Sequence, residues 1–211
     1  DVGKKTTCIR YKTKVMKDSL VDLFEITKED LNPDIKKYVL YCDLDGVICD
    51  FKTRFEDLFS KGPREIENEK GAPYFWAMIR RVGSKFWSRM PWTPGGKTLW
   101  ESIKEYDPKI LTAPPRKQGD FSSFDESAME GKSQWVSQNL GSYEVLFKSS
   151  KNKKEIAAQD VAKGLIPILI DDRESNIKGW ESSGGIGIHH PENGNPSNVI
   201  SQIKPNIIEN G

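Results

Sequence analysis

Acidic side chains follow two apolar segments of the chain, at the point where each segment ends. Asp43 and Asp45 come directly after the apolar run 37–42, and Asp171 and Asp172 follow a second such run. Clustered carboxylates repel one another and are costly to desolvate, so stability alone does not explain them. Carboxylate oxygens are ligands that a hard divalent cation such as Mg²⁺ prefers. The sequence therefore predicts a magnesium centre.

The spacing of the first acidic pair is suited to phosphoryl chemistry. Residues two positions apart in an extended segment face the same side, so Asp43 and Asp45 can address one substrate. Asp43 can attack phosphorus to give an aspartyl-phosphate. Asp45 can protonate the leaving oxygen and later activate water, and neighbouring carboxylates would raise its pKa toward that task. Gly46 permits the tight turn that such a loop needs.

A hydroxyl group and a group of lysines follow two further apolar runs. Thr112 comes directly after the run 109–111. The run 144–147 is followed within a few residues by Lys148, Lys151, Lys153 and Lys154. A lysine that converges with carboxylates indicates a bound phosphate as well as a metal ion.

Short apolar runs without alternation are typical of strands that are buried on both faces of a parallel sheet. Five such runs are present, at 37–42, 109–111, 144–147, 166–170 and 185–188. Helical patterns between several of them predict an α/β fold with a doubly wound, mainly parallel five-stranded sheet. Ligands of such sheets bind at the carboxyl ends of the strands, where the polar groups described above would meet.

The segments between the strands differ in character. Phe51, Phe55, Leu58 and Phe59 lie on one face of a helix, within an insertion too long for a simple crossover. Further helices are predicted at 128–140, at 153–162 with Asn152 as the cap, and at 196–203, and the segment 114–127 is predicted to be an exposed loop. The predicted organisation is an N-terminal extension of unknown role (1–36), a catalytic core (37–51 and 94–211) and a small helical cap (52–93).

Composition excludes several classes of protein. The 32 Lys and Arg residues nearly balance the 31 Asp and Glu residues, which disfavours stable nucleic-acid binding. No apolar run approaches the roughly 18–20 residues that cross a bilayer, so no membrane association is expected. Three cysteines without a C-x-x-C pair favour a reducing, cytoplasmic setting.

The order of the polar groups resembles the four motifs of the haloacid dehalogenase-like (HAD) phosphohydrolases. The matching residues are Asp43-Leu44-Asp45-Gly46-Val47, Leu111-Thr112, a lysine after the third strand, and Ile170-Asp171-Asp172. We choose Lys151 as that lysine because its spacing from Phe147 fits the family motif. The 69 positions between Asp43 and Thr112 (112 − 43) resemble members whose cap lies between the first and second motifs.

Within that superfamily the chain is most similar to the 5′(3′)-deoxyribonucleotidases. The likeness rests on the segments 43–51 and 131–141, the pair Phe75-Trp76, and the run 170–173. It implies that Asp43 is the nucleophile and a metal ligand, and that Asp45 is the acid/base with its backbone carbonyl on Mg²⁺. The other implied roles are phosphate binding by Thr112 and Lys151, metal binding by Asp172 with support from Asp171, and a nucleoside pocket formed by Phe51, Phe75 and Trp76 with Arg173 nearby.

The predicted function is that of a Mg²⁺-dependent phosphomonoesterase for a small phosphate monoester, with a deoxyribonucleoside monophosphate as the first choice. A sugar-phosphate phosphatase and a nucleic-acid 3′-phosphatase share the same core and stay open as alternatives. A catalytically idle, nucleotide-binding regulator is an alternative from another class. Aromatic residues also form cap cores, so the sequence leaves open which rings line the site, and it leaves a homodimer open as well.

Overall fold

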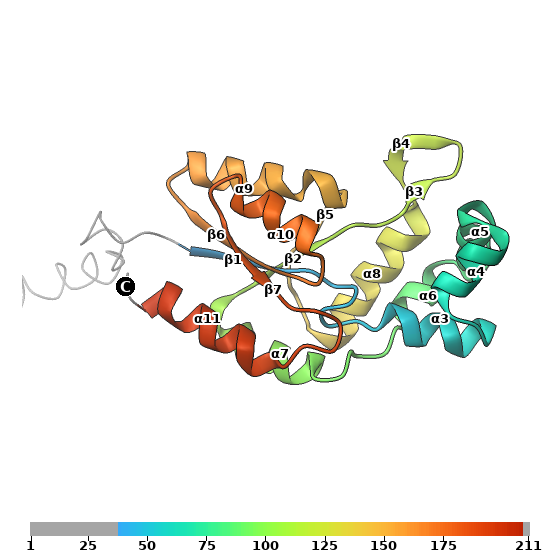
Figure 1. The fold of residues 1–211 in the computed structure, drawn as a ribbon, viewed down its shortest axis with the longest axis horizontal. Coiled ribbons are helices and arrows are strands. Elements are labelled where there is room, and N and C mark those ends of the chain that lie inside the picture. Colours follow the sequence, from blue (N-terminus) through green and yellow to red (C-terminus); the bar gives the residue numbers. More distant parts are fainter. Residues whose placement is uncertain (1–37, 209–211) are drawn as a thin grey trace, which may run out of the picture. The chain divides into compact units, whose positions relative to one another are not determined.

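The computed structural model describes residues 38–208, so the predicted N-terminal extension 1–36 lies outside the described residues. Within them, five strands form one sheet in the order β5-β2-β1-β6-β7, and every neighbouring pair is parallel (Figure 1). The strands are β1 (Tyr38–Cys42), β2 (Lys109–Thr112), β5 (Val145–Phe147), β6 (Ile166–Asp171) and β7 (Ile186–His189). The predicted doubly wound parallel α/β sheet is confirmed.

Alternate residues of the central strands point to opposite faces of the sheet and enter two separate hydrophobic clusters. Leu40 and Cys42 belong to one cluster, whereas Tyr41 between them belongs to the other. In β6, Leu169 lies on the face of Tyr41, and its neighbours Ile168 and Ile170 lie on the opposite face. Both faces are therefore buried, which explains why the strands are apolar without interruption.

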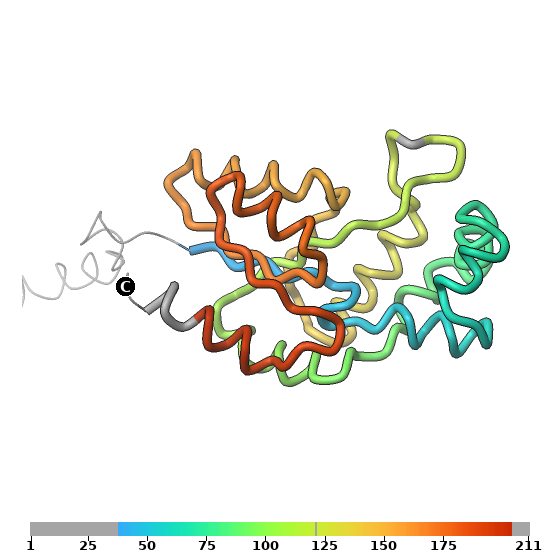
Figure 2. The backbone as a smooth tube through the Cα atoms, in the orientation of Figure 1, coloured from blue at the N-terminus to red at the C-terminus, as the bar shows by residue number. Residues whose placement is uncertain are grey.

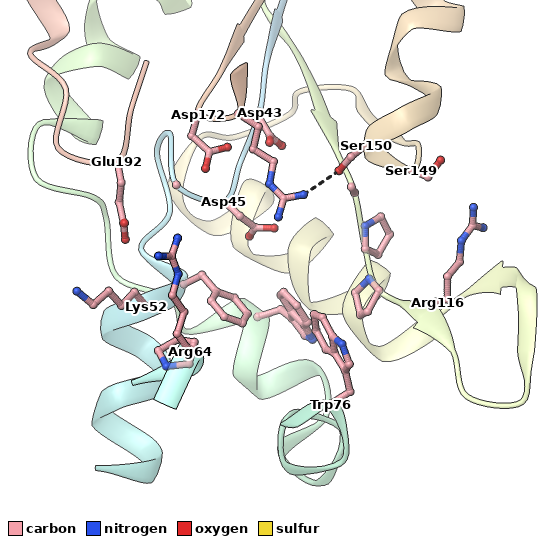
Figure 3. Close-up of a pocket in the computed structure, with 18 of the residues that line it drawn as sticks. Asp43, Asp45, Lys52, Arg64, Trp76, Arg116, Ser149, Ser150, Asp172 and Glu192 are labelled. Atoms are coloured by element: carbon pink, nitrogen blue, oxygen red, sulfur yellow. Dashed lines mark hydrogen bonds between the residues drawn. The ribbon is translucent and has the colours of Figure 1, made fainter. Parts of the chain in front are cut away.

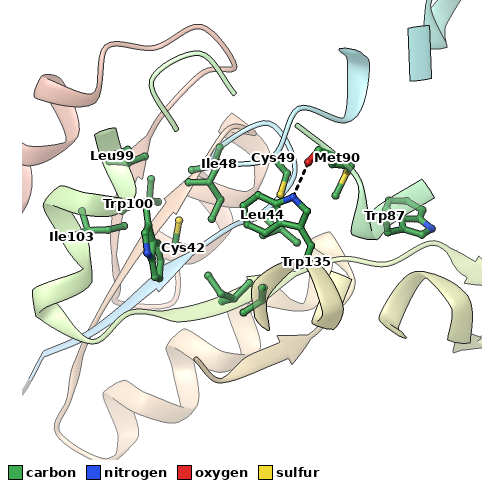
Figure 4. Packing of buried hydrophobic residues seen from close by; sticks show 14 of the residues in the cluster. Cys42, Leu44, Ile48, Cys49, Trp87, Met90, Leu99, Trp100, Ile103 and Trp135 are labelled. Carbon is green, nitrogen blue, oxygen red and sulfur yellow. Dashed lines mark hydrogen bonds between the residues drawn. The ribbon is translucent and has the colours of Figure 1, made fainter. Parts of the chain in front are cut away.

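Helices cover each face of the sheet. Figure 1 shows α9 (Lys153–Ala162) and α10 (Glu174–Glu181) on one face, with α7 (Gly96–Ile103) and α11 (Pro196–Ile208) on the other. The face of α7 and α11 is completed by α8 (Glu126–Asn139), whose Trp135 lies in the larger cluster. The Trp135 indole donates to the Met90 carbonyl at 2.8 Å (Figure 4), which ties α8 to the segment that leads out of the cap.

Four helices separate β1 from α7, as the long insertion predicted. They are α3 (Phe51–Phe59), α4 (Pro63–Lys70), α5 (Ala72–Val82) and α6 (Ser84–Ser88), and we call them the cap. Figure 2 shows the chain leaving β1, passing through these helices and returning to α7. Phe55 and Phe86 are fully buried inside the cap. The cap and the sheet belong to one compact unit.

The segment 114–127 is not the plain loop that its composition predicted. It contains an antiparallel hairpin of β3 (Arg116–Lys117) and β4 (Asp120–Phe124). Gly119 has φ of 81°, a conformation that a tight two-residue turn needs and that glycine adopts without strain. The Arg116 guanidinium lies 4.5 Å from the centre of the Phe124 ring, which holds the two strands together.

Helix ends differ slightly from the prediction. Asp125 accepts a hydrogen bond from the Ala128 amide at 3.2 Å, so α8 begins at Glu126 rather than at residue 128. Helix α11 begins at Pro196 as predicted but continues to Ile208. Between residues 38 and 208, no helix combines the length and the apolar character needed to span a membrane.

Candidate active site

Three carboxylates meet at the carboxyl ends of β1 and β6 because these strands are neighbours. The Asp43 amide donates to the Ile170 carbonyl at 2.9 Å, which continues the pairing of β1 with β6 beyond Cys42. Ligand oxygens of Asp43, Asp171 and Asp172 consequently lie within 4.8 Å of one another. The parallel pairing of two distant segments therefore produces the acidic cluster that the sequence predicted.

The loop after β1 turns sharply at Gly46. This residue has φ of 79°, and its amide donates to the Cys49 carbonyl at 2.8 Å. A Cβ at this position would lie 2.7 Å from Asp172 Oδ2. Both the backbone conformation and the close approach of Asp172 require glycine here. Gly46 thus allows the loop to bring Asp45 and Asp172 to the same cavity.

The lysine that reaches the cluster is Lys153. Its side chain is fully buried, and its ammonium lies 2.9 Å from Asp43 Oδ2 and 2.7 Å from Asp171 Oδ2. Burial alone would lower the pKa of Lys153, but Asp43 and Asp171 outweigh burial and raise it. The side chain therefore stays an ammonium that neutralises part of the acidic cluster.

Lys151 does not occupy the place that its spacing predicted. It is exposed in the 3₁₀ turn Ser150–Asn152, whereas Lys153 begins α9. The 3₁₀ turn lies between β5 and α9. Because of this turn, the first residue of α9, which faces the strand ends, is Lys153 and not Lys151. The prediction of Asn152 as a helix cap, which makes Lys153 the first helical residue, was the sequence signal that could have favoured Lys153.

A second buried lysine, which sequence reasoning did not assign to the site, holds Asp45 and Thr112. Lys132 on α8 pairs with Asp45 Oδ2 and donates to Thr112 Oγ1 at 2.8 Å. Burial raises the pKa of the Asp45 carboxyl, and Lys132 offsets part of that rise. Ala128 and Trp135 lie on the same buried face of α8, so the helical periodicity of this segment was a signal for Lys132.

Asp171 and Asp172 have different surroundings. Asp171 is fully buried, and its carboxylate accepts hydrogen bonds from Lys153, the Arg173 amide at 2.9 Å and Asn176 Nδ2 at 2.9 and 3.0 Å. No donor among residues 38–208 hydrogen-bonds the Asp172 carboxylate. Burial, followed by the charges of Asp43 and Asp171, raises the pKa of Asp172 to about 7. Asp171 is therefore held by the protein, while Asp172 is left for an external cation.

The donor set fits Mg²⁺. The four site carboxylates described above face two buried ammonium groups, so the cluster carries a charge of −2 when all of these groups are ionised. A divalent cation balances that charge, and carboxylate oxygens are its preferred ligands. The unsatisfied carboxylate of Asp172 and the oxygen atoms of Asp43 are the groups that would hold the ion.

A cavity of about 740 Å³ lies between these carboxylates and the cap (Figure 3). Asp43, Asp45 and Asp172 lie at its sheet end, and Trp76 lies on the cap side. The remaining walls include aromatic, cationic, acidic and hydroxyl side chains, and the cationic ones outnumber the acidic ones: Phe51 and Trp87; Lys52, Arg64, Arg116 and Arg173; Glu65 and Glu192; Ser149 and Ser150. The cavity thus offers a cationic rim and an aromatic wall above an acidic floor.

The predicted aromatic residues are divided between the cavity and the cap interior. Phe51 and Trp76 line the cavity, and so does Trp87, which the sequence had not singled out. Phe75 is only 5% exposed and packs 5.0 Å from Phe55, centre to centre, in the cap core. The structure does not bring Phe75 to the cavity; Trp76, the next residue and about 100° farther around α5, lines it instead. Arg173 does line the cavity, as expected, and hydrogen-bonds Ser150 at 3.4 Å.

Comparisons with known proteins give a fold likeness only. No protein-family model and no curated protein matches the chain. A HAD-superfamily hydrolase from Ehrlichia chaffeensis is 12% identical, with 82% of this chain and 98% of that chain covered and a TM-score of 0.45. A hydrolase from Streptococcus pneumoniae is 14% identical, with 72% and 92% covered and a TM-score of 0.45.

A third similar structure is a HAD family enzyme from Bacteroides thetaiotaomicron, solved as a magnesium complex. It is 18% identical, with 74% of this chain and 94% of that chain covered and a TM-score of 0.43. At these identities and TM-scores, the likeness assigns no role to any residue of this chain. The roles below therefore rest on the motif residues and on the geometry of the site.

Asp172→Asn tests the cation site through stability. Because the folded pKa of about 7 exceeds the ordinary value of 3.8, the metal-free protein loses stability as the pH rises through this window. In EDTA, the substitution should raise the melting temperature at pH 8 and raise it less at pH 5. Added Mg²⁺ should stabilise the wild type and not the variant. Asp57→Asn, on the exposed side of α3, is the matched control, and equal Mg²⁺ stabilisation of Asp172→Asn would contradict the assignment.

Lys153→Ala and Lys151→Ala together test which lysine belongs to the site. Loss of Lys153 leaves Asp43 and Asp171 as uncompensated buried charges. The free energy of unfolding of Lys153→Ala should therefore be about 3–5 kcal/mol lower than that of the wild type. Loss of the exposed Lys151 should change it by less than about 0.5 kcal/mol. Urea unfolding of both variants measures the two free energies of unfolding. Equal losses in Lys153→Ala and Lys151→Ala would contradict the assignment of Lys153 as the site lysine.

Proposed function

We propose that the protein is a Mg²⁺-dependent phosphomonoesterase that acts through an aspartyl-phosphate on Asp43. The observation that carries this proposal is the placement of Asp43 beside Lys153 and Asp172, at the floor of an open cavity, with Asp45 next to it. A nucleophile, an ammonium group, a candidate metal ligand and an acid are the parts that this reaction needs. Their order along the chain also resembles that of the HAD phosphohydrolases.

In the first half of the reaction, a carboxylate oxygen of Asp43 forms a bond to phosphorus while the ester P–O bond breaks. Asp45 gives its proton to the leaving oxygen. Burial raises the pKa of Asp45, which favours the protonated carboxyl that this step requires. The Leu44 amide donates to Asp43 Oδ1 at 2.8 Å and Lys153 contacts Oδ2, so the nucleophile is held in one orientation.

In the second half, Asp45, now ionised, accepts a proton from water as the water attacks the phosphorus of the aspartyl-phosphate. The bond between phosphorus and the Asp43 oxygen breaks, and inorganic phosphate leaves. When bound, Mg²⁺ would neutralise charge on the phosphoryl oxygens and orient them. Thr112 Oγ1 accepts from Lys132 and keeps its own proton for donation. Thr112 is fully buried and is not among the residues that line the cavity, so its predicted phosphate contact stays a prediction.

The cavity supports a nucleotide as the substrate, and a deoxyribonucleoside monophosphate is the first candidate. Its volume of about 740 Å³ falls in the range of small-ligand sites. Phe51 and Trp76 are partly exposed and offer ring faces on which a base could stack, and the cationic side chains of the walls suit an anion. A sugar phosphate would use the same floor without needing the aromatic wall.

A panel of monophosphates tests the proposal. The wild type should release phosphate from deoxyribonucleoside monophosphates only with Mg²⁺, and faster than from phosphosugars. Asp43→Asn should lower the rate on the order of 10³-fold or more because its amide is not a nucleophile. Asp57→Asn should match the wild type. If phosphosugars are hydrolysed as fast as deoxyribonucleoside monophosphates, the nucleotide assignment is wrong. Preference for a 3′-phosphorylated oligonucleotide would favour the nucleic-acid 3′-phosphatase.

Absence of Mg²⁺-dependent phosphate release from every member of the panel would overturn the enzymatic proposal. Nucleotide binding without turnover would then favour the idle regulator. Calorimetric titration of the same monophosphates into the protein distinguishes these two cases.

A further inference from the structure

Lys132 is a fully buried cation that faces the candidate site from a helix of the sheet domain. Its ammonium contacts Asp45 Oδ2 and Thr112 Oγ1, and it lies 5.0 Å from the centre of the Trp87 ring. A buried ammonium is costly unless partners surround it. Here a carboxylate, a hydroxyl and an aromatic face provide those partners, which come from three different elements of the chain.

The contact with Lys132 leaves the two oxygens of Asp45 in different states. Oδ2 is engaged by the ammonium, whereas Oδ1 is buried and has no hydrogen-bond partner among the described residues. An unsatisfied carboxylate oxygen of this kind is disfavoured in a purely structural pair. The Asp45 side chain as a whole is 28% exposed and lines the cavity, so the carboxyl group faces the cavity while Lys132 fixes its rotation through Oδ2.

We propose that Lys132 is a positioning residue for the proposed phosphatase reaction: by tying Asp45 Oδ2 to Thr112, it fixes the orientation of the Asp45 carboxyl at the cavity. Lys132 acts through Asp45 and does not itself touch the reacting atoms. This inference rests on the proposed function, and it assigns a task to the one buried cation of the described site that does not contact Asp43.

The cap contributes to this arrangement through Trp87. A Cβ on Gly131 would lie 2.3 Å from the Ser84 carbonyl oxygen and 2.7 Å from Trp87 Cβ, so α6 packs directly against α8 at this point. That close approach places the Trp87 ring over the Lys132 ammonium. The ring also lines the cavity, so it separates the ion pair from solvent and strengthens it.

Lys132→Met tests the inference because it keeps the length and apolar stem while removing the charge. When one partner of a buried ion pair is replaced by an apolar side chain, the fold is destabilised only if the other partner stays charged and unpaired. We expect kcat to fall about 10²–10³-fold, as for loss of general acid–base function, with KM and the affinity for inorganic phosphate within about threefold. Gln138→Met, on the exposed face of the same helix, is the matched control and should keep the kcat of the wild type.

A double-mutant cycle with Asp45→Asn separates positioning from a general structural effect. If Lys132 acts through Asp45, Lys132→Met should change kcat by less than about twofold in the Asp45→Asn background. The melting temperature of the double variant should match or exceed that of Lys132→Met, because no unpaired charge remains. Additive losses of kcat in the cycle would overturn the proposal.

The outcomes for this inference and for the proposed function are distinguishable. A wild type without phosphatase activity would refute the proposed function. An active wild type with unchanged kcat in Lys132→Met, or with the loss confined to KM, would overturn only the role of Lys132. If Lys132→Met fails to fold, Lys132→Gln, which keeps a donor and loses the charge, is judged by the same criteria.

Discussion

Electrostatic repulsion among clustered carboxylates is the constraint on which the rest of this structure depends. Two parallel strands end in aspartates at the same edge of the sheet, and their side chains are largely removed from water. Such a cluster is unstable unless cations enter it. Lys153 and Lys132 supply two of these cations from the first turn of α9 and the buried face of α8. The remaining negative charge makes the cluster a candidate site for a divalent ion.

The same constraint links the cap to the chemistry. Lys132 can remain buried only because Trp87 and α6 cover it, and α6 can approach α8 only because residue 131 is glycine. The segment after α6 is fixed in turn, since Thr93 Oγ1 donates to the Val47 carbonyl at 2.7 Å. The cap therefore covers the cavity and also supports the loop that carries Asp43 and Asp45.

The sequence predicts those parts of the fold and site that depend on local pattern. Unbroken apolar runs identify the five strands of the main sheet but not the hairpin of β3 and β4, and the aspartates at the ends of β1 and β6 identify the acidic cluster. The choice between Lys151 and Lys153 depends on one turn of 3₁₀ helix, which spacing alone does not reveal. Helical periodicity places Lys132 on the buried face of α8, but its contact with Asp45, 87 positions away in the sequence, follows from the packing of that helix and not from a local pattern. Phe75 and Trp76 are adjacent, and the rotation of α5 decides which of them meets the cavity.

Beryllofluoride binding followed by ¹⁹F NMR tests the central claim most directly, because this anion mimics a phosphoryl group on an aspartate carboxylate. The account predicts a protein-bound fluoride resonance that requires Mg²⁺ and disappears in Asp43→Asn. It also predicts that the resonance persists in Asp57→Asn. A wild type that gives no bound resonance in the presence of Mg²⁺, or an Asp43→Asn variant that retains it, would contradict the assignment of Asp43 as the nucleophile.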